Sequence, residues 1–209
     1  MAHYTGPSCR LCRRQGEKMM LKGERCSTPK CALERRQSPP GHRKRTRPRK
    51  MSEYGIRLVE KQKAKQIYGV LERQMRRHFK AAAMAPGRTG ERMLQILEMR
   101  LDNAVYRLGY AESRPQARQL VLHGFITLNG RKTDIPSCLV KPGDAIAWKA
   151  GKDKRVPYQA ALQNIGSKTI PAWLSVDNQT LVAKVLTEPS KEDIGVTINE
   201  RLIVEYYSR

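Results

Sequence analysis

The sequence RLDNAVYRLGYAESRPQARQLVLHGFITLNGR, residues 100–131, has the clearest structural pattern in this chain of 209 residues. Its first part continues an apolar stripe that begins at Leu94 and recurs every three or four residues up to Leu108, which predicts a helix ended by the next glycine. Residues 113–116 (SRPQ) have the form of a capping box, so they predict the start of a second helix that ends at Gly124.

A small sheet is predicted directly after these two helices. Residues 125–128 (FITL) are typical of a strand, and Asn129-Gly130 is the strongest short signal for a β-hairpin turn. A further turn at residues 141–144 (KPGD) precedes a second strand pattern at residues 145–148. Residues 91–150 are therefore predicted to form a small module, with two helices packed on a twisted antiparallel sheet around a core of its own.

The flanks of this module predict a mostly helical domain into which the module is inserted. Residues 54–80 show apolar residues at four-residue steps, with the basic residues largely off that stripe, and predict one long helix. Residues 151–209 contain a predicted helix near 158–164 and a predicted closing strand at 202–207. The expected fold class is α+β, with residues 51–90 and 151–209 forming the helical or mixed domain.

Residues 1–50 are a separate, basic extension. Five prolines interrupt any long helix there, so the segment needs an external staple to become ordered. Residues 35–50 contain eight basic residues and no acidic residue. Such a run could be a solvated tail, but its charge favours an arm that binds phosphates.

Four of the five cysteines lie within the first 31 residues, in two close pairs. Cys9 and Cys12 are separated by two residues, and Cys26 and Cys31 by four. Four thiolates in two pairs are the ligands that a tetrahedral metal ion needs, so one structural zinc ion is expected. Incidental buried cysteines and an iron–sulfur cluster remain alternatives. Cys138 stands alone and is expected to carry no ligand.

The net charge identifies the kind of partner. The chain has 41 Lys and Arg against 19 Asp and Glu, a formal charge of +22, and residues 1–80 carry most of the excess. A charge of this size repels itself unless a polyanion neutralises it. The chain has no apolar run long enough for a membrane span and no secretory h-region, so a cytoplasmic location is expected and a membrane role is not.

The sequence offers little for catalysis. The four histidines lie far apart in the chain, and no P-loop or dinucleotide-binding motif is present. The segment Arg100-Leu101-Asp102 is similar to the one that holds the catalytic aspartate of RNA pseudouridine synthases. Here it lies in a predicted amphipathic helix with no large catalytic domain around it, so Asp102 is interpreted as a surface residue near arginines, and no enzyme activity is expected.

Several basic residues are predicted to share helix faces. Arg100, Asn103 and Arg107 follow the spacing i, i+3 and i+7, and Arg114 and Arg118 are separated by four residues. These spacings predict a polar face on each of the two module helices.

The same segments resemble a known family, the S4 proteins of the small ribosomal subunit, whose small RNA-binding module is also found in many RNA enzymes. The module resemblance is carried by residues 100–107 (RLDNAVYR), 113–121 (SRPQARQLV) and 129–131 (NGR). The flanking resemblance is carried by residues 54–55 (YG), 60–63 (EKQK), 67–74 (IYGVLERQ), 171–174 (PAWL) and the ending at 198–209 (INERLIVEYYSR). It extends over essentially the whole chain.

Membership in this family would imply a structural constituent of the small subunit rather than an enzyme. The resemblance implies a primary binder of small-subunit (16S) ribosomal RNA that organises a multi-helix junction early in assembly. It implies ribosomal proteins S5 and S3 as neighbours, a place at the channel through which messenger RNA enters, and a contribution to decoding fidelity. It also implies a monomer within the ribosome and a zinc-binding subset of the family. The sequence differs from many members at residues 40–43 (PGHR) and at Pro115.

Together, the charge pattern and the resemblance assign three surfaces to RNA. The basic arm would pass between RNA helices, the residues of the 54–80 helix would cover another RNA helix, and the module would face phosphates and sugar edges. The assigned residues are Arg43, Lys44, Arg45, Arg47, Arg49, Lys50, Lys61, Lys63, Lys65, Arg73, Arg76, Arg100, Arg107, Arg114, Arg118, Asn129, Gly130 and Arg131. An RNA-modifying enzyme and a zinc-dependent DNA-binding regulator are the alternative functions, but the former lacks a catalytic domain and the latter a recognition helix after the cysteines.

Overall fold

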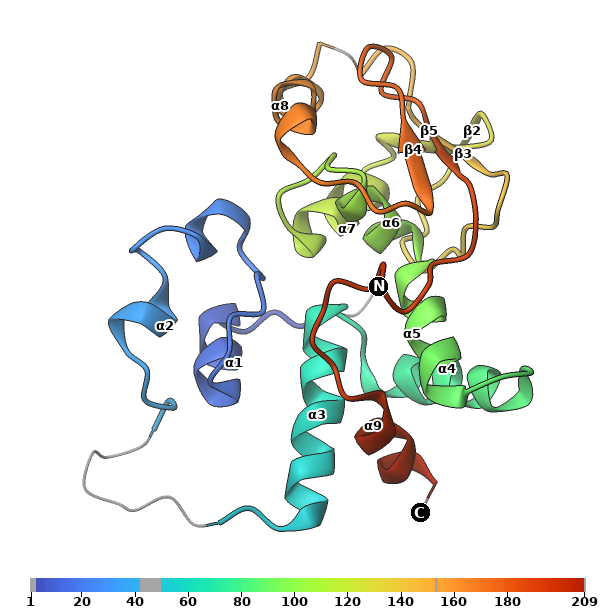
Figure 1. The fold of residues 1–209 in the computed structure, drawn as a ribbon. Coiled ribbons are helices and arrows are strands. Elements are labelled where there is room, and N and C mark those ends of the chain that lie inside the picture. The colour runs from blue at the N-terminus through green and yellow to red at the C-terminus, as the bar shows by residue number, and fades with distance from the viewer. Residues whose placement is uncertain (1–2, 42–49, 153, 209) are drawn as a thin grey trace. The chain divides into compact units, whose positions relative to one another are not determined.

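The computed structural model describes residues 3–41, 50–152 and 154–208. The chain divides into two compact units. Unit 1 comprises the residues up to Met93 together with those from Val196 onward, and unit 2 comprises Leu94–Gly195. Figure 1 gives the order of the elements along the chain.

Unit 1 is helical. A short helix α1, a 3₁₀ turn η1 and a one-turn helix α2 precede two longer helices, α3 and α4. Helix α5 begins in unit 1 and ends in unit 2. Helix α9 follows unit 2 in the sequence but belongs to unit 1. The bounds are Ser8–Gln15 for α1, Gly23–Cys26 for η1, Ala32–Arg35 for α2, Glu53–Ile67 for α3, Glu72–Met84 for α4, Thr89–Glu98 for α5 and Glu200–Tyr207 for α9.

The single long helix expected over residues 54–80 is wrong, because the chain breaks into α3 and α4. Gly69 adopts a left-handed conformation, with φ of 62°, and the backbone of Leu71 is extended. Glycine is the residue that populates left-handed φ at low cost, so Gly69 can end the helix although the apolar spacing continues through it. Met75 of α4 is still fully buried, as its place on the predicted stripe indicated.

Residues 202–207 form helix α9, so the expected closing strand is wrong. The helix packs alongside α3 (Figure 1), where Arg57 donates from Nε to a carboxylate oxygen of Glu205 at 2.6 Å and Glu60 accepts from the backbone N–H of Asn199 at 2.8 Å. Ile203 is fully buried. Burial of one apolar helix face therefore outweighs the strand propensity of the Ile, Val and Tyr residues in this segment.

Unit 2 contains the predicted helix pair and hairpin, with a larger sheet than expected. Five antiparallel strands are ordered β2-β1-β3-β5-β4. Asn129 and Gly130 both have positive φ, 52° and 77°, so the hairpin turn forms as the sequence predicts. The bounds are Leu101–Arg107 for α6, Arg114–Leu122 for α7, Ile126–Leu128 for β1, Arg131–Lys132 for β2, Ala145–Trp148 for β3, Val156–Asn164 for α8, Ile165–Ser167 for the 3₁₀ turn η2, Leu174–Val176 for β4 and Ala183–Val185 for β5.

The expected domain boundary at residue 150 differs from the structure, because residues 151–195 belong to unit 2. Strand β5 pairs with β3 in the register Ala145↔Lys184, and β4 extends the sheet beyond it. Trp173 is fully buried in the core that α6, α7, α8 and the sheet share, and the hydroxyl of Tyr110 donates to the carbonyl of Leu181 at 2.7 Å. The segment therefore closes the core of the module.

A second predicted helix is also interrupted. The stripe from Leu94 to Leu108 runs through α5 and α6, but Arg100 between them is extended, with φ of −68° and ψ of 139°. Arg100 forms an isolated antiparallel bridge with Leu139, and the backbone N–H of Leu101 donates to the carbonyl of Cys138 at 2.8 Å. A contact with a distant loop thus replaces one helical turn and turns the Arg100 side chain away from the expected face.

Candidate nucleic-acid interface

Arg100 is completely buried, so the expected surface face shared by Arg100, Asn103 and Arg107 is wrong. Its guanidinium donates from Nε and Nη2 to the two carboxylate oxygens of Asp102, at 3.1 and 2.7 Å. Asp102 is buried too, at 4% exposure, and also accepts from Nη1 of Arg118 at 2.9 Å. Asp102 therefore holds two arginines by charge-assisted hydrogen bonds and is not the surface aspartate that the sequence suggested.

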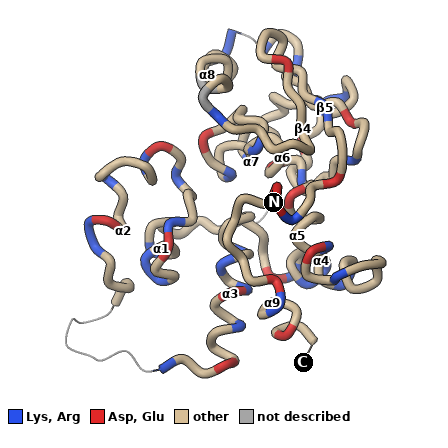
Figure 2. Tube along the Cα trace, in the orientation of Figure 1, with Lys and Arg blue, Asp and Glu red and all other residues tan. Residues whose placement is uncertain are grey.

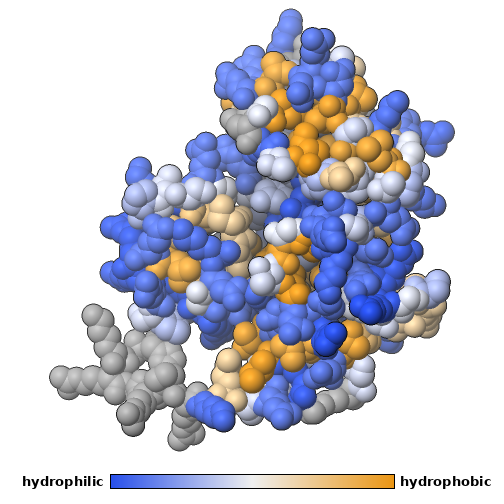
Figure 3. All heavy atoms as spheres, viewed as in Figure 1, coloured by the Kyte–Doolittle hydropathy of each residue, from blue (hydrophilic) through white to orange (hydrophobic). Residues whose placement is uncertain are grey.

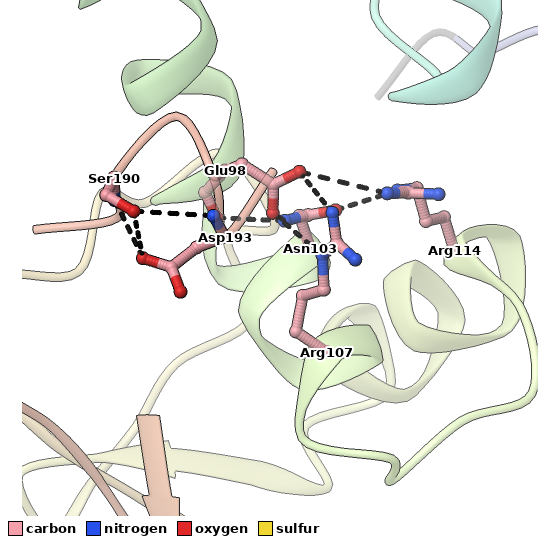
Figure 4. Close-up of polar contacts among 6 residues, drawn as sticks. All are labelled: Glu98, Asn103, Arg107, Arg114, Ser190 and Asp193. Carbon is pink, nitrogen blue, oxygen red and sulfur yellow. Dashed lines mark hydrogen bonds and ion pairs between the residues drawn. The ribbon is translucent and has the colours of Figure 1, made fainter. Parts of the chain in front are cut away.

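A second buried carboxylate, that of Glu98, holds two more of the predicted arginines (Figure 4). Arg107 donates from Nε to one carboxylate oxygen at 2.9 Å and from Nη2 to the other at 2.7 Å. Nη2 of Arg114 lies 4.0 Å from Glu98. Glu98 is completely buried, and sequence reasoning missed it because it comes at the end of α5, nine residues before its main partner.

Asn103 joins Arg114 to this carboxylate. Its amide nitrogen donates to Glu98 at 2.6 Å, and its amide oxygen accepts from Nε of Arg114 at 2.7 Å. The Arg114 guanidinium also lies 4.5 Å from the ring centre of Tyr106, within cation–π range. The side chains of Arg107, Arg114 and Arg118 keep 10–15% of their area exposed, so they are largely buried but still reach the surface.

The hairpin turn is exposed, but the side chain of Asn129 is used internally. Its amide donates to Asp144 at 2.8 Å, and its oxygen accepts from the backbone N–H of Ala145 at the same distance. Gly130 and Arg131 are exposed. The turn can thus offer backbone groups and the charge of Arg131, while Asn129 fixes its shape.

The lysines of the 54–80 segment that were predicted to face RNA are mostly buried. Lys61 is 2% exposed, donates to Glu72 at 2.8 Å and lies 4.7 Å from the ring centre of Tyr206. Lys63 is 7% exposed and pairs with Glu17, whereas Lys65 is half-buried and reaches Glu72 at 3.3 Å. Their stems pack in unit 1 because partners from distant parts of the sequence neutralise their charges.

Helix α4 carries an exposed basic surface in unit 1. Arg73 and Arg76 are exposed as predicted, and so are Arg77 and Lys80, which the sequence assignment omitted. The spacing i, i+3, i+4 and i+7 places all four on one helix face, opposite the fully buried Met75. We call these four residues the α4 basic stripe.

Five of the assigned residues of the basic arm lie outside the described part of the chain: Arg43, Lys44, Arg45, Arg47 and Arg49. Lys50, at its end, is described and exposed. Figure 2 shows Lys and Arg distributed along both units, with fewer Asp and Glu. On the face seen in Figure 3, hydrophilic residues cover most of the surface and apolar residues form smaller patches.

The four N-terminal cysteines lie in unit 1 and form no disulfide. Burial raises the pKa of the Cys12 thiol above its ordinary value, and the nearby sulfurs of Cys26, Cys9 and Cys31 raise it further, while a hydrogen bond from a backbone N–H lowers it. The backbone N–H of Lys22 also points to the sulfur of Cys26, at 3.4 Å. Among the described residues, no three His, Cys, Asp or Glu side chains are arranged so that they could hold a metal ion.

Within the described residues, no helix is long and apolar enough to cross a membrane.

Two family models match consecutive parts of the chain. Residues 3–98 match the ribosomal protein S4/S9 N-terminal domain, and residues 99–146 match the S4 domain. The chain is 56% identical to the small ribosomal subunit protein uS4 of Dictyoglomus turgidum over 209 residues, which covers all of both proteins. The chain belongs to the S4 family. The uS4 protein of Halothermothrix orenii and the uS4A protein of Alkaliphilus metalliredigens are each 54% identical to it, also over the full length of both chains.

S4 family membership confirms the coarse interpretation of the sequence, a structural protein of the small ribosomal subunit and not an enzyme. The S4 domain match ends at residue 146, whereas the compact unit of the structure continues to Gly195. In this member of the S4 family, strands β4 and β5 therefore complete a sheet that begins inside the matched domain.

Proposed function

We propose that this S4 family protein is a primary binder of small-subunit (16S) ribosomal RNA that organises a multi-helix junction early in the assembly of the subunit. The full-length similarity to small ribosomal subunit proteins carries this proposal. The net charge of +22 supports it, because a polyanion is the partner that relieves such an excess. So does the α4 basic stripe, whose four cations can follow a phosphate backbone.

The finer parts of the proposal concern the protein's place in the subunit. Ribosomal proteins S5 and S3 are its proposed neighbours, at the channel through which messenger RNA enters, where it contributes to decoding fidelity. The protein acts in the cytoplasm, or in an organelle with ribosomes of this type, and as one copy per subunit. An RNA-modifying activity is not supported, because Asp102 is engaged with Arg100 and Arg118.

Salt dependence of RNA binding tests the proposal. We expect the logarithm of the affinity for transcribed 16S RNA of Dictyoglomus turgidum, measured by filter binding, to fall linearly with the logarithm of salt concentration, since each phosphate contact adds about 0.7–0.9 to the slope. Changing Arg73, Arg76, Arg77 and Lys80 together to Gln should reduce the slope. The charge-retaining control, with the three arginines changed to Lys, should keep it.

A flat salt dependence would contradict the proposal. Equal affinity for duplex DNA under the same conditions would favour the alternative of a DNA-binding regulator instead.

We also propose that Cys9, Cys12, Cys26 and Cys31 hold one structural zinc ion. Four sulfur donors in two close pairs are the ligand set that structural zinc sites use. The described residues do not gather them into such a set, so zinc would have to draw them together. The backbone N–H of Lys22 directed at Cys26 is the kind of contact that stabilises a thiolate next to a metal. Bound zinc would close the loops between α1 and α2, a region whose prolines and short helices provide little core of their own.

Metal analysis tests the zinc proposal. Protein purified without added metal should contain one zinc per chain, and Cys26→Ser with Cys31→Ser should lose it. The double variant should become sensitive to protease within residues 1–41, while unit 2 stays protected. A wild-type protein that contains no metal and still resists protease in this region would contradict the proposal.

A further inference from the structure

Glu98 is a buried carboxylate that contacts Asn103 and Arg107 of α6 and Arg114 of α7. It accepts one hydrogen bond from Asn103 and two from Arg107, and it lies near the guanidinium of Arg114 (Figure 4). Removing a carboxylate from water is costly, and apolar residues of similar volume often stabilise a protein as well or better. Stability alone therefore does not account for an acid at this place.

Besides neutralising charge, Glu98 fixes the orientation of the arginine guanidinium groups that it contacts. The bidentate pair with Arg107 fixes the plane of the guanidinium as well as its position. Arg114 is fixed through Asn103, whose amide can have only one orientation because one end donates to Glu98 and the other accepts from Arg114. The ring of Tyr106 supports the Arg114 guanidinium from its face.

Both arginines are largely buried but reach the surface. Their side chains are 15% and 10% exposed, whereas the carboxylate between them is not exposed at all. Phosphate and base edges are recognised by guanidinium edges in a defined plane, and a guanidinium held in advance loses less conformational freedom on binding. The carboxylate itself cannot contact an RNA surface.

We propose that Glu98 is a positioning residue for RNA recognition: it holds Arg107 directly, and Arg114 through Asn103, in the orientation in which they meet the RNA. This inference rests on the proposed function. By net charge alone, removing one acid from a protein of charge +22 should strengthen its binding to any RNA. The positioning role predicts the opposite, that neutralising Glu98 weakens binding to the 16S RNA.

The test compares Glu98→Gln with Glu192→Gln, an identical chemical change at an exposed acid of the same unit. Each protein is titrated with 16S RNA of Dictyoglomus turgidum and with an RNA of equal length and unrelated sequence. We expect Glu98→Gln to weaken binding to the 16S RNA about tenfold, the loss of about one charge-assisted contact, and to leave binding to the unrelated RNA equal or tighter. Glu192→Gln should weaken neither.

Two further variants separate positioning from folding. Arg107→Lys keeps the charge but cannot form the bidentate pair, so it should lower the preference for 16S RNA as Glu98→Gln does. In an Arg107→Ala background, Glu98→Gln should lower the affinity for 16S RNA by a smaller factor than it does in the wild type, since part of its effect acts through Arg107. If Glu98→Gln does not fold, the Arg107→Lys result decides.

Tighter or unchanged binding of 16S RNA by Glu98→Gln would overturn the proposal, as would full preference for 16S RNA in Arg107→Lys. An equal loss for both RNAs would also overturn it, because that result indicates general damage. If the wild-type protein itself shows no preference for 16S RNA, the proposed function fails instead, and that outcome is visible before any variant is made.

Discussion

Asp102 balances two cations inside unit 2. Arg100 is buried beside it, and Arg118 reaches it from α7. Breaking a buried pair by removing one charge typically costs about 3–5 kcal/mol, because the partner charge stays buried without compensation. We therefore expect Asp102→Asn to lower the free energy of unfolding by an amount in this range, measured by urea denaturation. Glu192→Gln should change it by less than about 0.5 kcal/mol.

The same variant tests the resemblance to the RNA pseudouridine synthases. Incubation of either protein with transcribed 16S RNA, followed by mapping of modified bases, should yield no pseudouridine. A modification made by the wild type and absent with Asp102→Asn would mean that Asp102 is catalytic.

Single residues also mark the limit of prediction from sequence. Gly130, Arg131, Arg73 and Arg76 are exposed as the pattern indicated. Lys61 was placed on a surface and is buried, because the sequence does not show that Glu72 and Tyr206 surround it. Long basic side chains bury their stems wherever a distant acid meets the charged end, so spacing along one helix is a poor guide to their exposure.

Elements were predicted well where local chemistry decides them. Ser113 caps α7 as expected and accepts from the backbone N–H of Gln116 at 3.4 Å, while the Gln116 side chain accepts from the backbone N–H of Glu112 rather than from that of Ser113. The Asn129-Gly130 turn also forms as expected. Helix α9 and the breaks at Gly69 and Arg100 were missed. Each of these depends on a contact with a remote segment or on a single glycine conformation, which apolar periodicity does not encode.

The junction of α3, α4 and α9 gives a prediction about pH. Burial would raise the pKa of Glu72, but hydrogen bonds from Lys61, Tyr207 and Lys65 outweigh it, so the pKa lies below its ordinary value of 4.5. Because the folded-state pKa is depressed, this stabilisation is complete above pH 4.5 and is lost as the pH falls through the lower folded-state value.

Glu72→Gln should therefore be less stable than the wild type at pH 7, and the difference should narrow below pH 4.5. Urea midpoints between pH 7 and pH 3 measure it, with Glu24→Gln, an exposed acid, as the control whose difference stays constant and small. A gap between Glu72→Gln and the wild type that does not depend on pH would show that Glu72 acts by packing alone.

At the scale of the whole molecule, the division into units predicts which fragment folds. Residues 94–195 contain the complete five-stranded sheet and its core, whereas residues 91–150 lack β4, β5 and the buried Trp173. We expect the first fragment to unfold cooperatively in urea and to give a near-ultraviolet circular dichroism signal from packed tryptophans. The second should show neither. Cooperative unfolding of residues 91–150 alone would mean that the core is complete without β4 and β5.

The fold class was predictable because the sequence patterns of the helix pair and the hairpin indicate an RNA-binding module within a mostly helical chain. The extent of the module was not. Strands β4 and β5 are three residues each, and the sheet gains them from a segment that follows α8, so no local pattern connects them to β3.

The two units differ in whether they are formed from one continuous segment of the chain. Unit 2 is one continuous segment, Leu94–Gly195, whereas unit 1 combines residues on both sides of it, with α9 packed along α3. During synthesis at about 5–20 residues per second, a continuous unit can fold soon after it leaves the ribosome. The part of α3 that packs on α9 must wait for that helix, so it stays uncovered for about 5–20 seconds while residues 94–195 are made. Unit 2, which contains the S4 domain, is thus the unit of the nascent chain that can complete its folding first.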